Sequence, residues 1–564
     1  MVNWESNRLH DLLVLGIGVV LAVLINQLSS LYFVRADLTE EKRYSIKQPT
    51  RDLLQNLEDD VYVEVFLEGD LNAGFRRLRK GVEETLEEFR VYSGNKVHYK
   101  FTDPATATGQ NARNEFMSLL ASKGIQPTNV IDTRNGQRTE KLVFPGALVS
   151  YEGGESGVML LKGNRALKSD EVLNQSIESI EFQLASTIQK LSFEERKKIG
   201  IVSGHQELDT LEMGSLRQAL SEGYDVFKVN LSSSVNLRAF DLLIIAKPQR
   251  NFSERDKFNL DQYILHGGRV LFLLDRLRVN LDSVSRDDYF ALPYPLGIDD
   301  QLFRYGVRIN PDLVLDRVAL RYPVVTGVVD GKPQMTPIEW PFMPLINHYA
   351  DHPVTRNLDV SVLRFASSLD TVKALGVKKT PLMYTSDYSK RLTAPVKVTV
   401  NDLRADNPES FAEKGIVLAY LLEGRFTSLY KNRFLPEGVD SAGFIADGPS
   451  RIIVVGDGDI ARNDVNLRSG QPKELGFDSF SGYTFANKDL LMNMVAFLAD
   501  ESGLINARSK EIKVRPLDKE RIRNERFMWQ VVNVALPVLL VIGMGIVKVY
   551  LRKKKYTNFG ISQS

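Results

Sequence analysis

Two long apolar segments stand near the ends of the chain, and shorter apolar runs fill the region between them. The first begins as LLVLGIGVVLAVLI at residues 12–25 and keeps its apolar character to Val34. The second lies at residues 529–551 and contains VNVALPVLLVIGMGIV. A helix rises about 1.5 Å per residue, so a segment of roughly 20 residues can cross a bilayer. The pattern predicts transmembrane helices at residues 12–34 and 529–551.

The first apolar segment has an alternative interpretation as a cleaved signal peptide. Its leader carries only Arg8 as a basic residue, and no small-x-small cleavage site precedes Arg35. These features favour an uncleaved anchor. In the second segment, Pro537 and the glycines Gly543 and Gly545 are residue types that membrane helices tolerate, and the two glycines are candidate helix contacts.

The basic residues that flank the two segments predict an orientation. The cluster Arg552–Lys555 directly follows the second segment and places its C-terminal side in the cytoplasm. The first segment points weakly the other way, because Arg8 precedes it while Arg35 and two further basic residues follow it. A chain with two spans has both termini on the same side of the membrane. We therefore take the orientation from the denser basic cluster, Arg552–Lys555. We expect both termini in the cytoplasm and residues 35–528 on the outer side.

Strand-like and helix-like patterns alternate in the first part of the region between the spans. VYVEVFL at residues 61–67 alternates as a strand does, and apolar residues at helical spacing predict a helix at residues 74–92. Further patterns predict a strand at 96–104, a helix at 111–123, a hairpin from 142–151 and 157–161, and a helix at 172–191. The order βαβαββα is that of thioredoxin-like domains, and it predicts such an α/β domain at residues 35–195.

Continuous apolar runs characterise a second region, predicted at residues 196–506. LLII at 242–245 and LFLL at 271–274 are typical of parallel strands buried on both faces. The helix between them has Ser253 as its cap, and RIIVVGDGD at 451–459 adds a later strand. The pattern therefore predicts a doubly wound α/β domain in this region. An insertion at about 296–450 interrupts it, and a charged juxtamembrane linker at 507–528 leads to the second span.

Composition narrows the range of functions. Among 564 residues, 72 Lys and Arg stand against 71 Asp and Glu, so the net charge of +1 gives no general attraction to nucleic acid. There is no cysteine. This excludes disulfide bonds, thiolate catalysis and cysteine-ligated zinc or iron–sulfur clusters.

The stretch GDGDIARND, at the end of the late strand, allows three interpretations. Gly456, Gly458 and Ala461 fit the G-x-G-x-x-A dinucleotide pattern, but Asp457 and Asp459 would repel a pyrophosphate. A metal site formed by these two aspartates and Asp464 lacks the regular spacing of a calcium loop. The favoured interpretation is a strand-end turn in which the glycines permit positive φ angles and the aspartates cap the next segment of the chain.

Other candidate motifs are weaker. The string GVVDGKP at Gly327–Pro333 is one residue short of a P-loop and has a proline where magnesium needs a hydroxyl, so we do not expect ATP hydrolysis by this chain. His348 and His352 are four residues apart, but Pro353 disfavours helical geometry and no glutamate completes a metalloprotease motif.

His205 comes after a buried type of strand, where a catalytic residue could lie. The chain has no G-x-S-x-G elbow to support a serine hydrolase. A packing or loop role for His205 is therefore favoured over a role as a base.

An ordered series of strings resembles the GldG family, the auxiliary components of the gliding-motility ABC transporter of Bacteroidetes. The strings include RADLTEEKRYS, FPGALVSY, LNQSIESIEFQLA, GHQEL, FRYGVRIN and NKDLLMNMVAFLADESGLINARSKEIKVRPLD, with an apolar span at each end. The resemblance implies an inner-membrane subunit with a large periplasmic region, beside a permease-like partner and a separate cytoplasmic ATPase. The doubly wound region is also similar to glutamine-amidotransferase-like folds, whose active members use a cysteine that this chain lacks.

These observations lead to one main hypothesis and two rivals. The main hypothesis is a non-catalytic transporter subunit without cofactor or metal, whose outer domains contact envelope or gliding-machinery proteins. The first rival is a membrane-anchored enzyme or ligand-binding protein with a polar pocket at the strand ends, near His205, Asp275 or Asp457. The second rival is a structural envelope scaffold that needs no ATPase. A deep crevice with converging titratable groups would favour the enzyme, and a filled one would favour the subunit.

Overall fold

The computed structural model describes residues 13–24, 45–104, 110–134, 137–163, 168–192, 196–232, 236–279, 289–329, 332–398, 407–439, 443–500, 502–509 and 519–557. The chain forms two compact units, Met1–Glu511 and Ile512–Ser564, and each is described by itself. Helices and strands are mixed in the first unit, which confirms an α/β protein.

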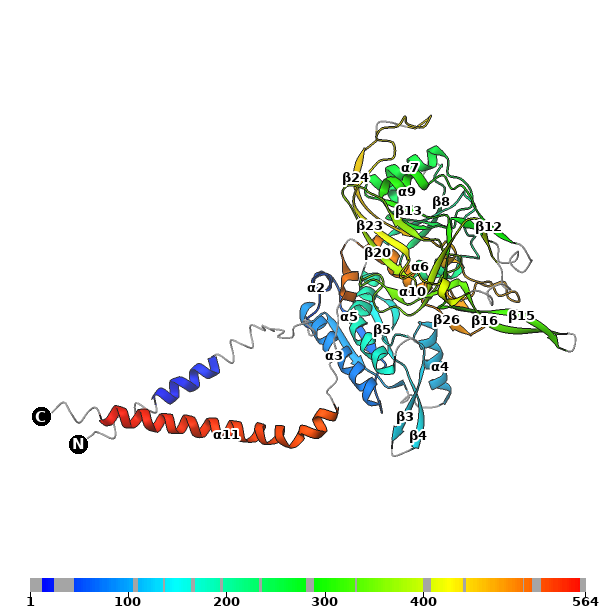
Figure 1. Ribbon diagram of the computed structural model, residues 1–564. Coiled ribbons are helices and arrows are strands. Elements are labelled where there is room, and N and C mark those ends of the chain that lie inside the picture. The colour runs from blue at the N-terminus through cyan, green and yellow to red at the C-terminus, as the bar shows by residue number, and fades with distance from the viewer. Residues whose placement is uncertain are drawn as a thin grey trace. The chain divides into compact units, whose positions relative to one another are not determined.

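A four-stranded sheet forms the core of the N-terminal part. Its order is β2-β1-β5-β6, with β1 parallel to β2 and antiparallel to β5. The strands are β1 (Val61–Val65), β2 (Val97–Phe101), β5 (Gly146–Tyr151) and β6 (Gly154–Met159). The helices α2 (Gln48–Gln55), α3 (Ala73–Tyr92) and α5 (Ser169–Ser192) share one hydrophobic core with this sheet, and α3 and α5 lie side by side (Figure 1). The predicted helices α3 and α5 are confirmed.

The predicted hairpin near residue 142 starts later than expected. Residues 142 and 143 belong instead to β4 (Gln137–Val143), which pairs with β3 (Thr128–Arg134) in a separate two-stranded ribbon. Helix α4 (Gln110–Ser122) precedes this ribbon. The thioredoxin-like assignment of residues 35–195 and its boundary stay predictions, because residues on both sides belong to one compact unit.

An eight-stranded sheet dominates the rest of the first unit. Its order is β17-β20-β23-β24-β10-β9-β7-β8, and the five strands from β24 to β8 run parallel. These five are β7 (Lys198–Val202), β8 (Asp225–Val229), β9 (Leu242–Ala246), β10 (Arg269–Leu273) and β24 (Asp447–Val455). Strands β9 and β10 are buried on both faces, as their continuous apolar runs predict.

Helices cover both faces of this sheet. Leu242 and Ile244 of β9 pack in a core with α6 (Gly214–Ser221) and α10 (Asn487–Ala499). Leu243 and Ile245 face the other core, with α7 (Glu254–Leu265) and α9 (Asp299–Tyr305). The cap predicted for α7 is confirmed: the Ser253 hydroxyl oxygen accepts a hydrogen bond from the Asp256 amide at 3.2 Å.

The segment predicted as an insertion is continuous with the main sheet. Strands β17 (His348–Tyr349), β20 (Val377–Tyr384) and β23 (Val417–Thr427) extend it with antiparallel pairing. The remaining strands of this segment and its flanks are β11 (Leu277–Arg278), β12 (Phe290–Pro293), β13 (Val307–Ile309), β14 (Asp312–Asp316), β15 (Ala319–Val329), β16 (Lys332–Ile346), β18 (Ser361–Val362), β19 (Leu369–Thr371), β21 (Ser389–Thr393), β22 (Val396–Lys397), β25 (Phe477–Asp478) and β26 (Tyr483–Thr484). In Figure 1 the long β15–β16 hairpin extends away from the sheet.

The second compact unit contains one long helix, α11 (Lys519–Thr557). Its stretch Arg523–Leu551 is long and apolar enough to cross a membrane, and the apolar window is not buried against other residues. The helix starts at Lys519 and the short helix η6 covers Leu504–Ser509, so the predicted linker at 507–528 is helical at both ends. The helix Leu13–Leu24 is apolar but short, and residues 25–34 of the predicted first span lie outside the described residues.

Candidate functional site at the carboxyl ends of the parallel strands

Three neighbouring parallel strands bring charged residues to one edge of the eight-stranded sheet. Lys247 directly follows β9, Asp275 follows β10 by two residues, and Asp457 follows β24 by two residues. Because the carboxyl ends of parallel strands meet at the same edge, these side chains converge where doubly wound proteins usually bind ligands. Asp459, in the short helix η5 (Asp459–Ala461), joins them.

The four side chains form a buried ion cluster. Single carboxylate oxygens of Asp275, Asp457 and Asp459 lie within 4.8 Å of one another. The Lys247 ammonium lies 3.0 Å from Asp275 Oδ2 and also pairs with Asp459. The Asp457 carboxylate accepts hydrogen bonds from the backbone amides of Arg364 and Asp459, each at 2.7 Å. The cluster therefore holds its own cation.

Burial and the neighbouring charges shift the pKa values of the groups in this cluster. Burial raises the pKa of Asp457, and the charges of Asp275 and Asp459 raise it further. Burial also raises the pKa of Asp275, while the Lys247 charge opposes this rise. For Lys247, burial alone would lower the pKa, but Asp275 and Asp459 outweigh it and raise the pKa above its usual value. A metal ion at these carboxylates would have to displace an ammonium that they already hold in its charged form.

The stretch GDGDI needs its glycines for close packing. A Cβ on Gly456 would lie 2.2 Å from the Ser367 carbonyl oxygen, and one on Gly458 would lie 2.7 Å from the Lys247 Cβ. The Gly458 amide also donates to Asp275. The adjoining helix η5 spans only three residues, so no long helix amino terminus is available for a pyrophosphate. This geometry agrees with a strand-end turn and gives the dinucleotide interpretation no support. The expected positive φ is wrong, because neither Gly456 nor Gly458 has one and the φ of Gly458 is −81°; the glycines are needed for lack of space and not for a left-handed backbone.

The proposed third metal ligand lies apart. Asp464 pairs with Arg364 at 3.5 Å and is not part of the cluster, while Asp275 takes the place that the sequence pattern assigned to it. Sequence reasoning also missed Lys247, because no motif marks it. Its φ of 52° is a left-handed conformation that lysine rarely adopts, which fits a residue held by strong local contacts.

His205 lies at the end of β7 between two acidic side chains. Its Nδ1 is 3.1 Å from Glu207 Oε1, its Nε2 is 3.2 Å from Asp256 Oδ2, and its ring stacks on Phe252. Burial alone would lower the pKa of His205, but hydrogen bonds and charges from Asp256 and Glu207 raise it to about 9. The ring is therefore protonated at neutral pH, with both nitrogens occupied, and cannot accept a proton there.

The other sequence candidates lie in separate places. His348 lies in β17 and His352 in the turn after it, where the His352 ring packs on Phe497 and burial lowers its pKa to about 4. The string Gly327–Pro333 forms the end of the β15–β16 hairpin, with residues 330 and 331 outside the described part, and not a strand-to-helix turn. In α11, a Cβ on Gly543 or Gly545 would meet no atom of the described residues within 4 Å.

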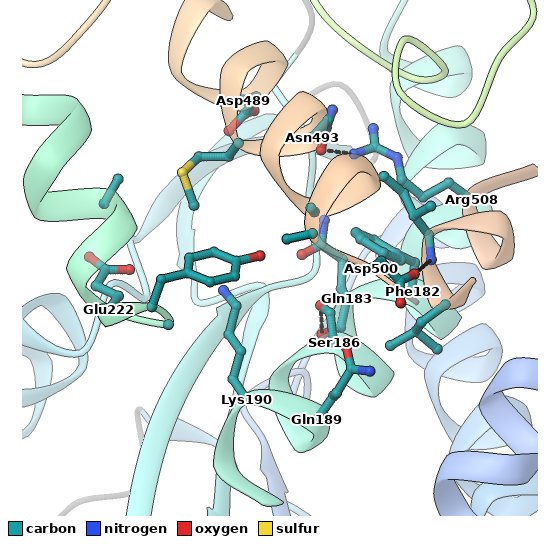
Figure 2. Close-up of a pocket in the computed structure, with 18 of the residues that line it drawn as sticks. Phe182, Gln183, Ser186, Gln189, Lys190, Glu222, Asp489, Asn493, Asp500 and Arg508 are labelled. Atoms are coloured by element: carbon teal, nitrogen blue, oxygen red, sulfur yellow. Dashed lines mark hydrogen bonds between the residues drawn. The ribbon is translucent and has the colours of Figure 1, made fainter. Parts of the chain in front are cut away.

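A cavity of about 510 Å³ lies elsewhere, between α5, the α6–β8 turn, α10 and η6. Figure 2 shows the Lys190 side chain extending from α5 into it, with Glu222 on one side and Arg508, beside Phe182, on the other. Lys197 and Tyr224 directly precede β7 and β8, so the cavity lies at the amino ends of the parallel strands. The usual rule for doubly wound folds points to the opposite edge, and sequence reasoning therefore missed this cavity.

Comparisons with known families match most of the chain. A family model described as "ABC-type uncharacterized transport system" matches residues 196–494. A second model, described as a domain of unknown function, matches residues 40–150. An uncharacterized protein of Borreliella burgdorferi is 21% identical over 563 residues, which are 98% of this chain and 99% of that protein.

Likenesses to solved structures are weak. The N-terminal domain of mmIFT52 is 14% identical, with 54% of this chain and 97% of that chain covered and a TM-score of 0.31. A ThuA-like protein of Parabacteroides merdae is 11% identical, with 57% and 93% covered and a TM-score of 0.27. Both TM-scores are too low to carry an argument about function or fold.

Proposed function

The chain belongs to the family of auxiliary components of an uncharacterized ABC-type transport system, and from this premise we propose that it is a non-catalytic, membrane-anchored subunit. In this role it associates with a permease-like membrane subunit and a separate cytoplasmic ATPase. Its α/β region presents a surface on the outer side of the inner membrane, for envelope or gliding-machinery proteins. The gliding-motility assignment rests on the ordered strings that resemble the GldG family.

The mutual pairing of the charged groups at the strand ends is the observation that carries the non-catalytic part of the proposal. In an enzyme with a doubly wound sheet, this edge holds groups that reach a substrate. Here the charged groups satisfy one another: Lys247 pairs with Asp275, and His205 pairs with Glu207 and Asp256. All five side chains are nearly inaccessible to solvent. The same observation speaks against the rival with a polar pocket at this edge.

The helix α11 supports the membrane anchor. Its stretch Arg523–Leu551 has the length and composition of a span, and the basic cluster Arg552–Lys555 directly follows it. The proposed topology has two spans, residues 12–34 and 529–551, both termini in the cytoplasm and the bulk of the chain in the periplasm. The charge distribution beside the C-terminal segment is its main support.

Co-purification tests the subunit role. The full chain, tagged at one end and extracted in mild detergent, should bring a permease-like protein and an ATPase with it in fixed proportion. An unrelated membrane protein with the same tag and similar abundance is the control. If the chain emerges alone from extracts in which other membrane complexes stay intact, the proposal fails. If the partners bind but inactivation of the ATPase leaves the cellular function unchanged, the scaffold rival is correct.

A further inference from the structure

The cavity between α5, the α6–β8 turn, α10 and η6 has walls from distant parts of the sequence. Helix α5 packs in the core of the four-stranded sheet, while α10 packs in a core of the eight-stranded sheet. A volume of about 510 Å³ is within the usual range of small-molecule sites, roughly 300–1,000 Å³. A ligand in this cavity would contact both sheet-based parts at once.

Two lysines of the cavity have no hydrogen-bonding or ion-pair partner among the described residues. In the described part of the chain, neither the Lys162 nor the Lys190 ammonium makes a hydrogen bond or an ion pair. Desolvation lowers the pKa of both, and the carboxylates of Asp489 and Glu222 offset this only partly from a distance. Lys190 is exposed and Lys162 is half-buried, so both ammonium groups can be reached by an anion that enters the cavity.

The other charged groups of the walls are already engaged. The Arg508 guanidinium donates to Asn493 and to the Arg356 carbonyl oxygen, and the Lys197 ammonium donates to the Ala499 carbonyl oxygen. The Asp500 carboxylate accepts from the Ser502 hydroxyl and the Ile505 amide. The Lys488 ammonium pairs with Glu474, outside the cavity. These contacts fix the walls, and Lys162 and Lys190 are left to face the cavity.

Charge and shape together indicate the kind of ligand. The lining contains five cations, Lys162, Lys190, Lys197, Lys488 and Arg508, and three carboxylates, Glu222, Asp489 and Asp500. The apolar part of the lining includes Phe182, Leu358 and Met492. An occupant with one acidic group and an apolar body matches both features.

We propose that this cavity binds a small organic anion, a carboxylate or phosphate monoester with an apolar part, whose charged group is held by Lys190 while Lys162 supplies a second positive charge. The binding site is independent of the transporter-subunit proposal. By joining α5 to α10 through one ligand, it would also tie the two sheet-based parts of the outer region together.

Binding to the purified full chain in detergent micelles tests this site. The probes are phenyl phosphate and benzoate, with benzyl alcohol as the neutral analogue of similar size. Titration calorimetry should show that at least one anion binds about tenfold or more tightly than the alcohol, because a charge-assisted hydrogen bond discriminates by at least that factor. Comparison of phenyl phosphate with benzoate distinguishes the two acidic groups.

Three variants make the result specific. Lys190→Met should weaken anion binding about tenfold or more, Lys162→Met should weaken it by a smaller factor, and Lys228→Met, on the exposed side of β8, should leave it unchanged. Without anion, Lys190→Met should unfold at about the same temperature as the parent chain, because Lys190 is exposed and its ammonium makes no hydrogen bond or ion pair with the described residues. A purely structural lysine would instead lower that temperature. Equal binding of anion and alcohol, unchanged affinity in Lys190→Met, or no binding of either anion would overturn the proposal.

Discussion

The charge of His205 ties the stability of the fold to pH. Its folded pKa of about 9 lies above the usual value of 6.5, so the protonated ring contributes fully to stability below pH 6.5. This contribution is lost as the pH rises through 9. The difference corresponds to about 3 kcal/mol for this buried side chain. The free energy of unfolding, measured by chemical denaturation, should therefore decline between pH 6.5 and 9.

Two histidine variants isolate this effect. His205→Gln should remove most of the decline, since glutamine cannot take up a proton. His266→Gln should keep the decline, because His266 bonds to a backbone carbonyl and to Arg238 and lies away from Glu207 and Asp256. A parent chain whose stability is flat over this range would show that His205 is neutral in the folded protein.

The Lys247 ammonium has an equally clear role in the strand-end cluster. Lys247→Met would leave Asp275 buried without its cation and Asp459 with only Arg462, 3.5 Å away, and removal of one partner from a buried ion pair costs about 3–5 kcal/mol. The free energy of unfolding at pH 7 should fall by this amount. Lys228→Met, at an exposed position, should change it by less than about 0.5 kcal/mol. Similar stabilities for the two variants would mean that the carboxylates take up protons at little cost.

Part of the strand-end site could be predicted from the sequence. Asp275, Asp457 and His205 each follow a recognisable strand, and the sheet brings the first two together as parallel order requires. Their partners could not be predicted. Lys247 reaches Asp275, and Asp256 reaches His205, only when separate strands and helices pack together. The ionisation state of His205 depends on those partners. The sequence alone could therefore locate the candidate residues, but it could not show whether His205 acts as a base or is held in ion pairs.

At the scale of elements, α11 makes a prediction about membrane insertion. A fusion of residues 519–557 to a soluble reporter should resist extraction with alkaline carbonate, because its apolar stretch is long enough to span. The substitutions Leu539→Lys and Val541→Lys together should release it, since each lysine near the centre of a span costs about 2.5–3.5 kcal/mol.

A single lysine near the end of the stretch is the matched control. Val547→Lys should leave the fusion in the membrane, because a lysine at the end of a span can extend its ammonium to the interface. Retention of the doubly substituted fusion, or release of the parent, would contradict a spanning role for α11.

Strands with one dominant hydrophobic pattern could be predicted from the sequence. Strands whose place depends on the strand they pair with could not. The apolar runs of β9 and β10 predict buried parallel strands because such strands have no polar face. Strands β20 and β23 carry mixed residues, so their sequences did not show that they extend the same sheet. The ribbon β3–β4 was missed for a similar reason, since its register depends on the pairing itself.

At the scale of the whole molecule, the absence of cysteine allows a direct test of the proposed topology. The variant Ser469→Cys places a single cysteine at an exposed position of the region proposed to be periplasmic, and Ser564→Cys places one after α11. In cells with a permeabilised outer membrane, a maleimide that cannot cross the inner membrane should label the first variant. It should label the second only after the inner membrane is disrupted, because the basic cluster Arg552–Lys555 predicts that the C-terminal side of α11 lies in the cytoplasm. The cysteine-free parent chain gives the background. Labelling of Ser564→Cys in cells whose inner membrane is intact would reverse the orientation of α11, and the α/β region could then no longer face the periplasm as a two-span subunit requires.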